Sequence, residues 1–177
     1  TMRATLSHMW DKSAQYLRKM GGLILVASLF VWFLSYFPRP VAGEPEIEHY
    51  ENSYLGQLGR WCEPAVEPLG LNWKAGVAIL SGVSAKEIVV STLGVLYSQD
   101  ATADDASLAQ TLRESGDFTP ASALAFLVFV LLYFPCIATI VAVRNEAGRG
   151  WALASMVYST AVAWFVAWIV YHIALLL

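Results

Sequence analysis

Three long apolar stretches alternate with polar segments along the chain. They cover residues 21–37, 121–143 and 151–177, and each approaches the roughly 20 apolar residues that a helix needs to cross a bilayer. The first stretch is the shortest, but Arg18 and Lys19 precede it and aromatic side chains end it, which is typical of a span anchored at both membrane interfaces. The pattern predicts three membrane-spanning helices.

A fourth apolar run, residues 71–98, carries two adjacent charged residues, Lys86 and Glu87. A charge at the bilayer centre costs roughly 2.5–3.5 kcal/mol on insertion scales, which disfavours one uninterrupted helix. Gly82 is a typical helix stop, and Ser84 with Glu87 has the S-x-x-E spacing of a capping box that starts a helix. We expect two half-helices that meet at Gly82 and Ser84 and face a cavity, because the bare backbone groups at a break need polar partners.

The broken run either crosses the membrane or turns back as a re-entrant hairpin. Crossing would separate the short turn that carries Arg144 and Arg149 from the basic amino-terminal segment, whereas a hairpin places both on one side of the membrane. The loop after the run offers only Arg113. Because basic residues in short loops favour the cytoplasmic side, the charge pattern favours a hairpin with its tip at residues 82–84.

The other segments are polar. Residues 1–20 form a basic segment before the first span, and residues 38–70 begin with an acidic loop. Residues 99–120 form a second polar loop, in which we expect one short helix over residues 106–114. These segments predict connections outside the hydrocarbon core.

One amphipathic helix is expected within the first polar connection. Its apolar residues recur at helical spacing, and a proline follows them; the residues are Leu55, Leu58, Trp61, Cys62 and Pro64. The spacing predicts a helix that lies in the membrane interface and ends at the proline. The predicted fold class is therefore all-α: a polytopic membrane protein with three spanning helices, one broken or re-entrant helix pair and an interfacial helix.

Composition agrees with a membrane protein. Of 177 residues, 57% are hydrophobic and 14% are charged, and the mean hydropathy is +0.53, which is too apolar for an ordinary soluble domain of this length. The formal net charge is -3, and no basic run is present, so a nucleic-acid partner is excluded. The two cysteines are far apart in sequence and predict no disulfide framework.

A candidate metal site lies in the second span, where Cys136 follows Pro135. Proline removes a backbone N–H and frees the carbonyl four residues earlier, here that of Leu131, and it kinks the helix. Thr139 lies three residues after the cysteine. A thiol, a hydroxyl and a bare carbonyl at one level suit a soft-to-borderline metal ion, and Glu87 would add a carboxylate if its helix end faced the same cavity. The alternative is that Cys136 acts as a small buried apolar side chain.

The charges at the break also have structural alternatives. Glu87 could serve only as a capping carboxylate folded back on the Ser84 N–H, while Lys86 extends its ammonium group to the membrane interface. The sequence leaves both interpretations open.

Three short motifs occur in two parts of the sequence. The first part contains E-P-x-x-x-P-L-G at residues 63–70 and A-K-E at residues 85–87, and the second contains P-C-x-A-T at residues 135–139. With these motifs the two parts resemble FeoB, a family of bacterial ferrous iron transporters. The similarity runs from about Leu6 to the end of the chain. It implies the carboxy-terminal membrane region, with the second of two Gate motifs, and it makes Cys136 the proposed cysteine of the iron path.

The resemblance also implies a function. The chain would be the carboxy-terminal part of a multi-pass Fe²⁺ transporter of the bacterial inner membrane, with Fe²⁺ as substrate, no stably bound cofactor and no enzymatic activity of its own. Its partners would be the lipid bilayer, the remaining part of the transporter and, in a homo-oligomer, further copies of the chain. GTP would bind to a separate amino-terminal domain, because the chain contains no G-x-x-x-x-G-K-[ST] phosphate loop.

Two other functions stay open. One is a Gate-type transporter of nucleosides or another solute, although few Asn and Gln residues lie in the spans to bind such a solute. The other is a non-transporting membrane assembly subunit, in which side chains of a partner would fill the break.

Overall fold

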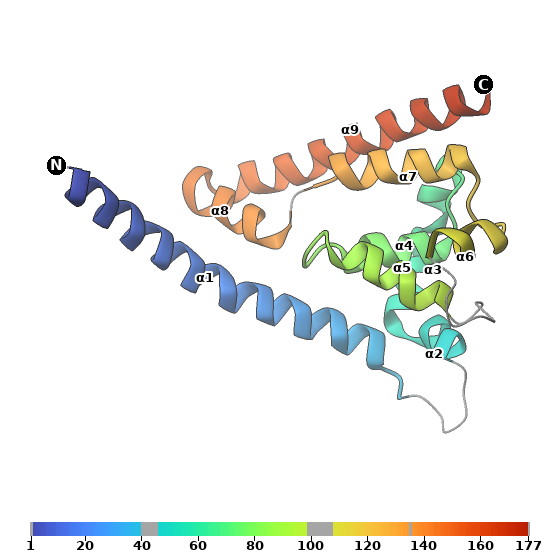
Figure 1. Cartoon of the computed structure of the whole chain (residues 1–177), viewed down its shortest axis with the longest axis horizontal. Helices are drawn as coiled ribbons and strands as arrows, with labels where there is room; N and C mark the ends of the chain where they lie inside the picture. The colour runs from blue at the N-terminus through green and yellow to red at the C-terminus, as the bar shows by residue number, and fades with distance from the viewer. Residues whose placement is uncertain (1, 40–45, 99–107, 135, 177) are drawn as a thin grey trace.

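The structure is a computed structural model that describes residues 2–39, 46–98, 108–134 and 136–176, and all regular secondary structure in these ranges is helical (Figure 1). The expected all-α class is confirmed. The elements in chain order are α1 (Met2–Tyr36), α2 (Glu46–Asn52), α3 (Tyr54–Val66), the 3-10 turn η1 (Glu67–Leu69), α4 (Trp73–Ser81), α5 (Ile88–Ser98), α6 (Leu108–Glu114), α7 (Pro120–Leu132), α8 (Ile137–Ala147) and α9 (Arg149–Leu175).

Helix α1 combines the basic segment and the first apolar stretch in one helix of 35 residues. It ends at Tyr36, two residues before Pro38, because a proline disfavours helical backbone in the residue that precedes it. The apolar part of α1 is Ile24–Tyr36, which is shorter than a full span. In Figure 1 α1 runs along one side of the other helices, and it contacts α3 and α8.

Two helical stretches of the described chain are long and apolar enough to cross a membrane. They are Pro120–Ala147, which contains α7 and α8, and Arg149–Leu175, which is α9. Helix α9 packs along both α7 and α8 (Figure 1), and its residues Ala163 and Ala167 are fully buried. Small residues let helix backbones approach closely in lipid, which is consistent with the packing of α9 along α7 and α8.

Helix α3 differs from the expected interfacial helix in two respects. Pro64 lies inside the helix, which continues to Val66; the prediction that Pro64 ends it is wrong, because the final turn passes directly into η1. The buried residues include Leu55, Gly56 and Gly59, whereas Trp61 is 79% exposed. A methyl group at Gly59 would clash with the Val77 side chain of α4, so α3 contacts α4 through glycine instead of through a continuous apolar stripe.

The end of α3 is also fixed to α9. The indole Nε1 of Trp164 donates a hydrogen bond of 2.6 Å to the carbonyl of Ala65. After η1 the chain turns at Gly70, whose φ of 70° is left-handed, and the Tyr171 ring of α9 fills the space beside this glycine. The short α6 begins at Leu108, within the predicted helix 106–114, of which residues 106–107 lie outside the described chain.

Candidate functional site

The run from residue 71 to residue 98 forms a hairpin of two short helices. The arms α4 and α5 have 9 and 11 residues, which makes them roughly 14 and 17 Å long. The side chain of Asn72, at the start of α4, donates a 3.3 Å hydrogen bond to the hydroxyl of Tyr97 at the end of α5. The two outer ends of the arms therefore meet. The described residues thus form a helical hairpin with its tip near residues 82–84, and each arm is too short to cross a hydrocarbon core of about 30 Å.

The turn at the tip is built from backbone bonds instead of a capping box. Gly82 ends α4 as expected, and its N–H donates to the Ala78 carbonyl. The hydroxyl of Ser84 donates to the carbonyl of Ser81 at 3.0 Å, and α5 starts only at Ile88. The prediction that Ser84 and Glu87 form a capping box is wrong, because the chain passes from α4 to α5 through two sets of turns, closed by N–H to carbonyl bonds three residues apart at residues 83–84 and 88–89.

A second break separates α7 from α8. Helix α7 ends at Leu132, Tyr133 is its extended cap, and Cys136 is the N-cap residue of α8. The sequence predicts a kink here, and the structure shows a complete interruption in which the backbone leaves the helical conformation. Pro135 itself lies outside the described residues.

The two breaks contact one another. The N–H of Ile137, the first residue of α8, donates a 3.2 Å hydrogen bond to the carbonyl of Val83 at the hairpin tip. Each break thus supplies a partner for a backbone group that the other leaves unpaired, as a dry environment requires. Two discontinuous helices meet at one point, which is the element from which many transporters build a substrate site.

Lys86 explains how a full charge is tolerated at this point. Its ammonium Nζ lies 3.0 Å from the Val130 carbonyl, 3.2 Å from that of Leu131 and 3.4 Å from that of Tyr133. It also lies 4.7 Å from the centre of the Tyr133 ring. The ammonium therefore caps the carboxy-terminal end of α7, where carbonyls lack helical partners and the helix dipole is negative.

Two expectations change with this contact. The ammonium of Lys86 does not extend away from the other helices but binds the carboxy-terminal end of α7. The Leu131 carbonyl is not bare, since the ammonium of Lys86 donates to it. A positive charge at this oxygen repels a metal ion, so Leu131 is removed from the candidate ligands.

The other candidate ligands are close together. The Sγ atom of Cys136 lies 3.8 Å from the Oγ1 atom of Thr139, and Glu87 is exposed within electrostatic reach of the Cys136 thiol. The described residues contain no group of three or more His, Cys, Asp or Glu side chains placed to hold a metal. The arrangement offers one thiol, one hydroxyl and one nearby carboxylate, which suits passing contact with a metal ion and not permanent retention.

Sequence reasoning missed Tyr133. Its side chain is 2% exposed, and its hydroxyl has no hydrogen-bond partner within the described chain. The ring stacks on Phe129 at 5.6 Å and receives the ammonium of Lys86. An aromatic residue near a membrane helix end is usually an interfacial anchor, so nothing in the sequence distinguished Tyr133 from the other tyrosines.

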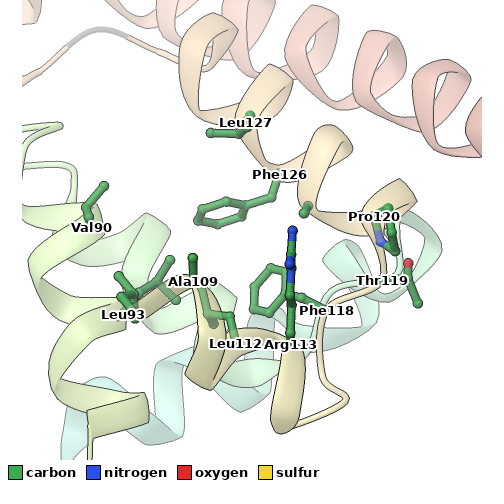
Figure 2. Close-up of a pocket in the computed structure, with 12 residues that line it drawn as sticks. Val90, Leu93, Ala109, Leu112, Arg113, Phe118, Thr119, Pro120, Phe126 and Leu127 are labelled. Carbon is green, nitrogen blue, oxygen red and sulfur yellow. The ribbon is translucent and has the colours of Figure 1, made fainter. Parts of the chain in front are cut away.

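A separate apolar pocket of about 390 Å³ lies between α5, α6 and α7. Figure 2 shows Phe126 directed from α7 toward Leu93 of α5, and Phe118 and Leu112 below it. Arg113 is the charged residue among the described lining residues. An ion entering this pocket would lose hydration and gain no ligand, so we assign the pocket no part in ion transfer.

The fold and the paired breaks define a class: a helical membrane protein with discontinuous helices that meet inside it. The sequence matches the Gate family, described as nucleoside recognition, over residues 17–150. The chain belongs to the Gate family.

Similarity to FeoB covers almost the whole chain. The chain is 41% identical to an Fe(2+) transport protein A/Fe(2+) transporter FeoB fusion protein of Porphyromonas gingivalis, over 99% of the chain and 26% of that protein. It is 37% identical to the Fe(2+) transporter FeoB of Campylobacter jejuni, over 95% of the chain and 28% of that protein. It is 34% identical to the Fe(2+) transporter FeoB of Methanocaldococcus jannaschii, over 96% of the chain and 25% of that protein. These matches confirm the resemblance inferred from the three motifs.

The chain spans about a quarter of the length of these curated relatives. No solved structure matches it. The relatives are named as transporters, which agrees with a location in a membrane.

Proposed function

We propose that the chain is the carboxy-terminal part of a transporter that moves Fe²⁺ across the cytoplasmic (inner) membrane. The names of the relatives support iron as the substrate. The observation that carries the proposal is the hydrogen bond between Val83 and Ile137, because it brings the hairpin tip to the break that carries Cys136. The chain would cross the membrane several times and have no enzymatic activity.

Cys136 would contact the ion as it passes. Fe²⁺ must lose most of its hydration shell to cross, so it needs ligands that replace water and still release the ion. One thiolate with the Thr139 hydroxyl satisfies this condition, whereas a closed set of thiolates would retain the metal. Glu87 would supply a second negative charge or accept the proton that the thiol loses on binding.

The remaining parts of the transporter would lie outside this chain. They would include the first Gate motif and a GTP-binding domain, with the bilayer and further copies of the protein as the other partners. Fe²⁺ is the transported substrate in this proposal, and no cofactor is stably bound.

A transporter of nucleosides is the second candidate, because the Gate family is described as nucleoside recognition. The discriminating experiment uses the full-length protein in proteoliposomes and measures uptake of ⁵⁵Fe²⁺ under reducing conditions and of radiolabelled adenosine. We expect the parent protein to take up iron. Cys136→Ser should reduce the rate of this uptake about tenfold or more, which corresponds to a loss of roughly 1.4 kcal/mol of transition-state stabilisation.

Cys62→Ser is the matched control, since Cys62 lies on α3, which contains neither break, and it should retain parental iron uptake. Adenosine uptake without iron uptake by the parent would overturn the proposal. Parental iron uptake by correctly inserted Cys136→Ser would overturn the assignment of the cysteine.

A further inference from the structure

The apolar pocket between α5, α6 and α7 has a positive charge at one end. Most of its lining consists of aliphatic and aromatic side chains, among them Leu93, Phe118 and Phe126. Arg113 lines the same pocket, and Figure 2 shows its side chain extending from α6 toward α7. The volume of about 390 Å³ falls in the range of roughly 300–1,000 Å³ that is typical of ligand sites. An apolar pocket with one cation fits an amphipathic ligand with an anionic group.

The charge of Arg113 is not compensated within the described chain. Arg113 is exposed and forms no ion pair with the described carboxylates, and none of the described lining residues is acidic. The nearby acidic side chains have other partners. Glu114 accepts a hydrogen bond of 2.9 Å from the Gln110 amide, and Asp117 accepts one of 2.9 Å from the Tyr97 hydroxyl. The pocket therefore offers a free guanidinium to an anion.

The amino-terminal end of α7 adds to this positive charge. Thr119, the N-cap residue, and Pro120, the first residue of α7, both line the pocket. The Thr119 hydroxyl accepts a 3.1 Å hydrogen bond from the Ser122 N–H, so the helix end is already capped and contributes only the partial positive charge of its dipole. This charge lies at the same end of the pocket as Arg113 and also favours an anion.

The pocket extends from the start of a candidate membrane span into its apolar part. The span begins at Pro120, and the lining continues along α7 to Leu127, a rise of roughly 10 Å. This is about a third of a hydrocarbon core of about 30 Å. Val90 and Leu127 are 62% and 58% exposed, so the apolar end is open at the protein surface. The charged end thus lies at the level of lipid headgroups, and the apolar end lies at the level of acyl chains.

We propose that this pocket binds an anionic phospholipid, whose phosphate pairs with Arg113 and whose acyl chain lies between Leu93 of α5 and Phe126 of α7. A guanidinium suits a phosphate group because it donates two parallel hydrogen bonds to it. The bound lipid would connect one arm of the hairpin to the helix that ends at the second break. The proposal goes beyond the proposed function and does not depend on which substrate is transported.

The test uses the full-length protein in phosphatidylcholine nanodiscs that contain a trace of phosphatidylglycerol with a photoactivatable diazirine on its acyl chain. Mass spectrometry compares the label on residues 123–127 with the label on α9 at Phe165, which is 57% exposed and lies outside the pocket. We expect this ratio to be about tenfold higher for phosphatidylglycerol than for phosphatidylcholine with the same diazirine, the effect of one charge-assisted contact.

Arg113→Gln should lower the ratio for phosphatidylglycerol about tenfold and leave that for phosphatidylcholine unchanged. Arg113→Lys should retain part of the preference, because an ammonium keeps the charge but not the paired hydrogen bonds. Arg149→Gln is the matched control, since Arg149 is also exposed at the start of a candidate span but does not line the pocket. It should keep the parental ratio. In nanodiscs of phosphatidylcholine alone, substitution of Arg113 should leave protein stability unchanged, because no anionic lipid is present.

Any of four results would overturn the site. They are equal ratios for the two lipids in the parent, equal losses in Arg113→Gln and Arg149→Gln, no label on residues 123–127, and displacement of the labelled lipid by inorganic phosphate as efficiently as by unlabelled phosphatidylglycerol. The third would mean that another part of the full-length protein fills the pocket, and the fourth that Arg113 binds phosphate without an acyl chain. Transport is not part of these measurements, so their failure would leave the proposed function unaffected.

Discussion

The side chain of Tyr133 lies against Gly82 at the tip of the α4–α5 hairpin. A methyl group at position 82 would lie 2.5 Å from the Tyr133 hydroxyl oxygen, and closer still to the Val89 side chain. Gly82 has a φ of -66°, which any residue can adopt. Glycine is therefore required here by space and not by backbone conformation, and its small size lets the two breaks approach.

Gly82→Ala should destabilise the protein by about 1–3 kcal/mol, because overpacking a tight contact forces side chains or backbone to shift. The expected result is a lower thermal transition temperature of the full-length protein in nanodiscs, followed by tryptophan fluorescence. Reduced iron uptake should accompany it, since the tip would move away from α8.

Gly94→Ala is the control for this prediction. Gly94 lies on α5, and no heavy atom lies within 4 Å of a methyl group placed there. Alanine is the better helix former by roughly 0.5–1 kcal/mol, so this variant should match or exceed the parental stability. Equal stability of the two variants would contradict the steric role of Gly82.

Lys86→Met should also destabilise the protein, by about 1–3 kcal/mol. Methionine keeps most of the length of the side chain but leaves the carbonyls at the end of α7 without their charged donor, and such carbonyls are costly to leave unpaired. The same variant should increase the rate at which N-ethylmaleimide labels Cys136, because the adjoining chain end loses its anchor.

Arg113→Met is the comparison, since it also removes one positive charge but from an exposed position on α6. It should change neither the transition temperature nor the labelling rate of Cys136. If Lys86→Met behaves like Arg113→Met, the ammonium cap contributes nothing measurable.

The hairpin could be predicted from sequence because local signals define it. Gly82 stops a helix, and Lys86 with Glu87 excludes an uninterrupted span. The hydrogen bonds at the tip could not be predicted in the same way. The S-x-x-E spacing of Ser84 and Glu87 is compatible with a capping box, but the Ser84 hydroxyl donates to a carbonyl three residues earlier. A short polar side chain can bond to several nearby backbone groups, and spacing does not select among them.

The partner of Lys86 could not be predicted from sequence. The carbonyls that it contacts lie 44 to 47 residues further along the chain, and backbone carbonyls have no sequence signature. Their availability depends on where α7 ends. The contact between Val83 and Ile137 is equally non-local, so the neighbourhood of Cys136 follows from tertiary structure alone.

Metal binding at Cys136 should strengthen as pH rises. The thiolate is the ligand, so the ion must displace a proton, and apparent affinity should increase by up to about tenfold per pH unit below the pKa of the thiol and level off above it. Co²⁺ is a suitable probe, because its thiolate charge-transfer absorption reports this bond directly.

Cys136→Ser should remove this pH dependence together with the absorption band. Burial raises the pKa of the Cys62 thiol, so Cys62 stays protonated at neutral pH and Cys62→Ser should leave the titration unchanged. A pH-independent affinity in the parent would show that the thiol does not bind the metal.

Trp164→Phe should weaken the attachment of α9 to α3. Phenylalanine keeps an aromatic ring but loses the hydrogen bond to the Ala65 carbonyl, at a cost of about 1 kcal/mol. Thermal unfolding should show the difference, with Trp151→Phe as control, because Trp151 is 72% exposed on the same helix. A loss of the same size in both variants would indicate a general effect of removing tryptophan.

A re-entrant α4–α5 hairpin would also fix which loops share a side of the membrane. Figure 1 shows the amino terminus and the α8–α9 turn toward one end of the molecule and α6 toward the other. Arg144 and Arg149 in this turn favour the cytoplasmic side.

In a background of Cys62→Ser and Cys136→Ser, an impermeant maleimide added to intact cells should therefore label Glu114→Cys and spare Gly148→Cys, while permeabilised cells should label both. Labelling of Gly148→Cys with Glu114→Cys protected in intact cells would contradict the re-entrant hairpin together with the charge argument, whereas labelling of both would mean that the stretch Pro120–Ala147 does not cross the bilayer.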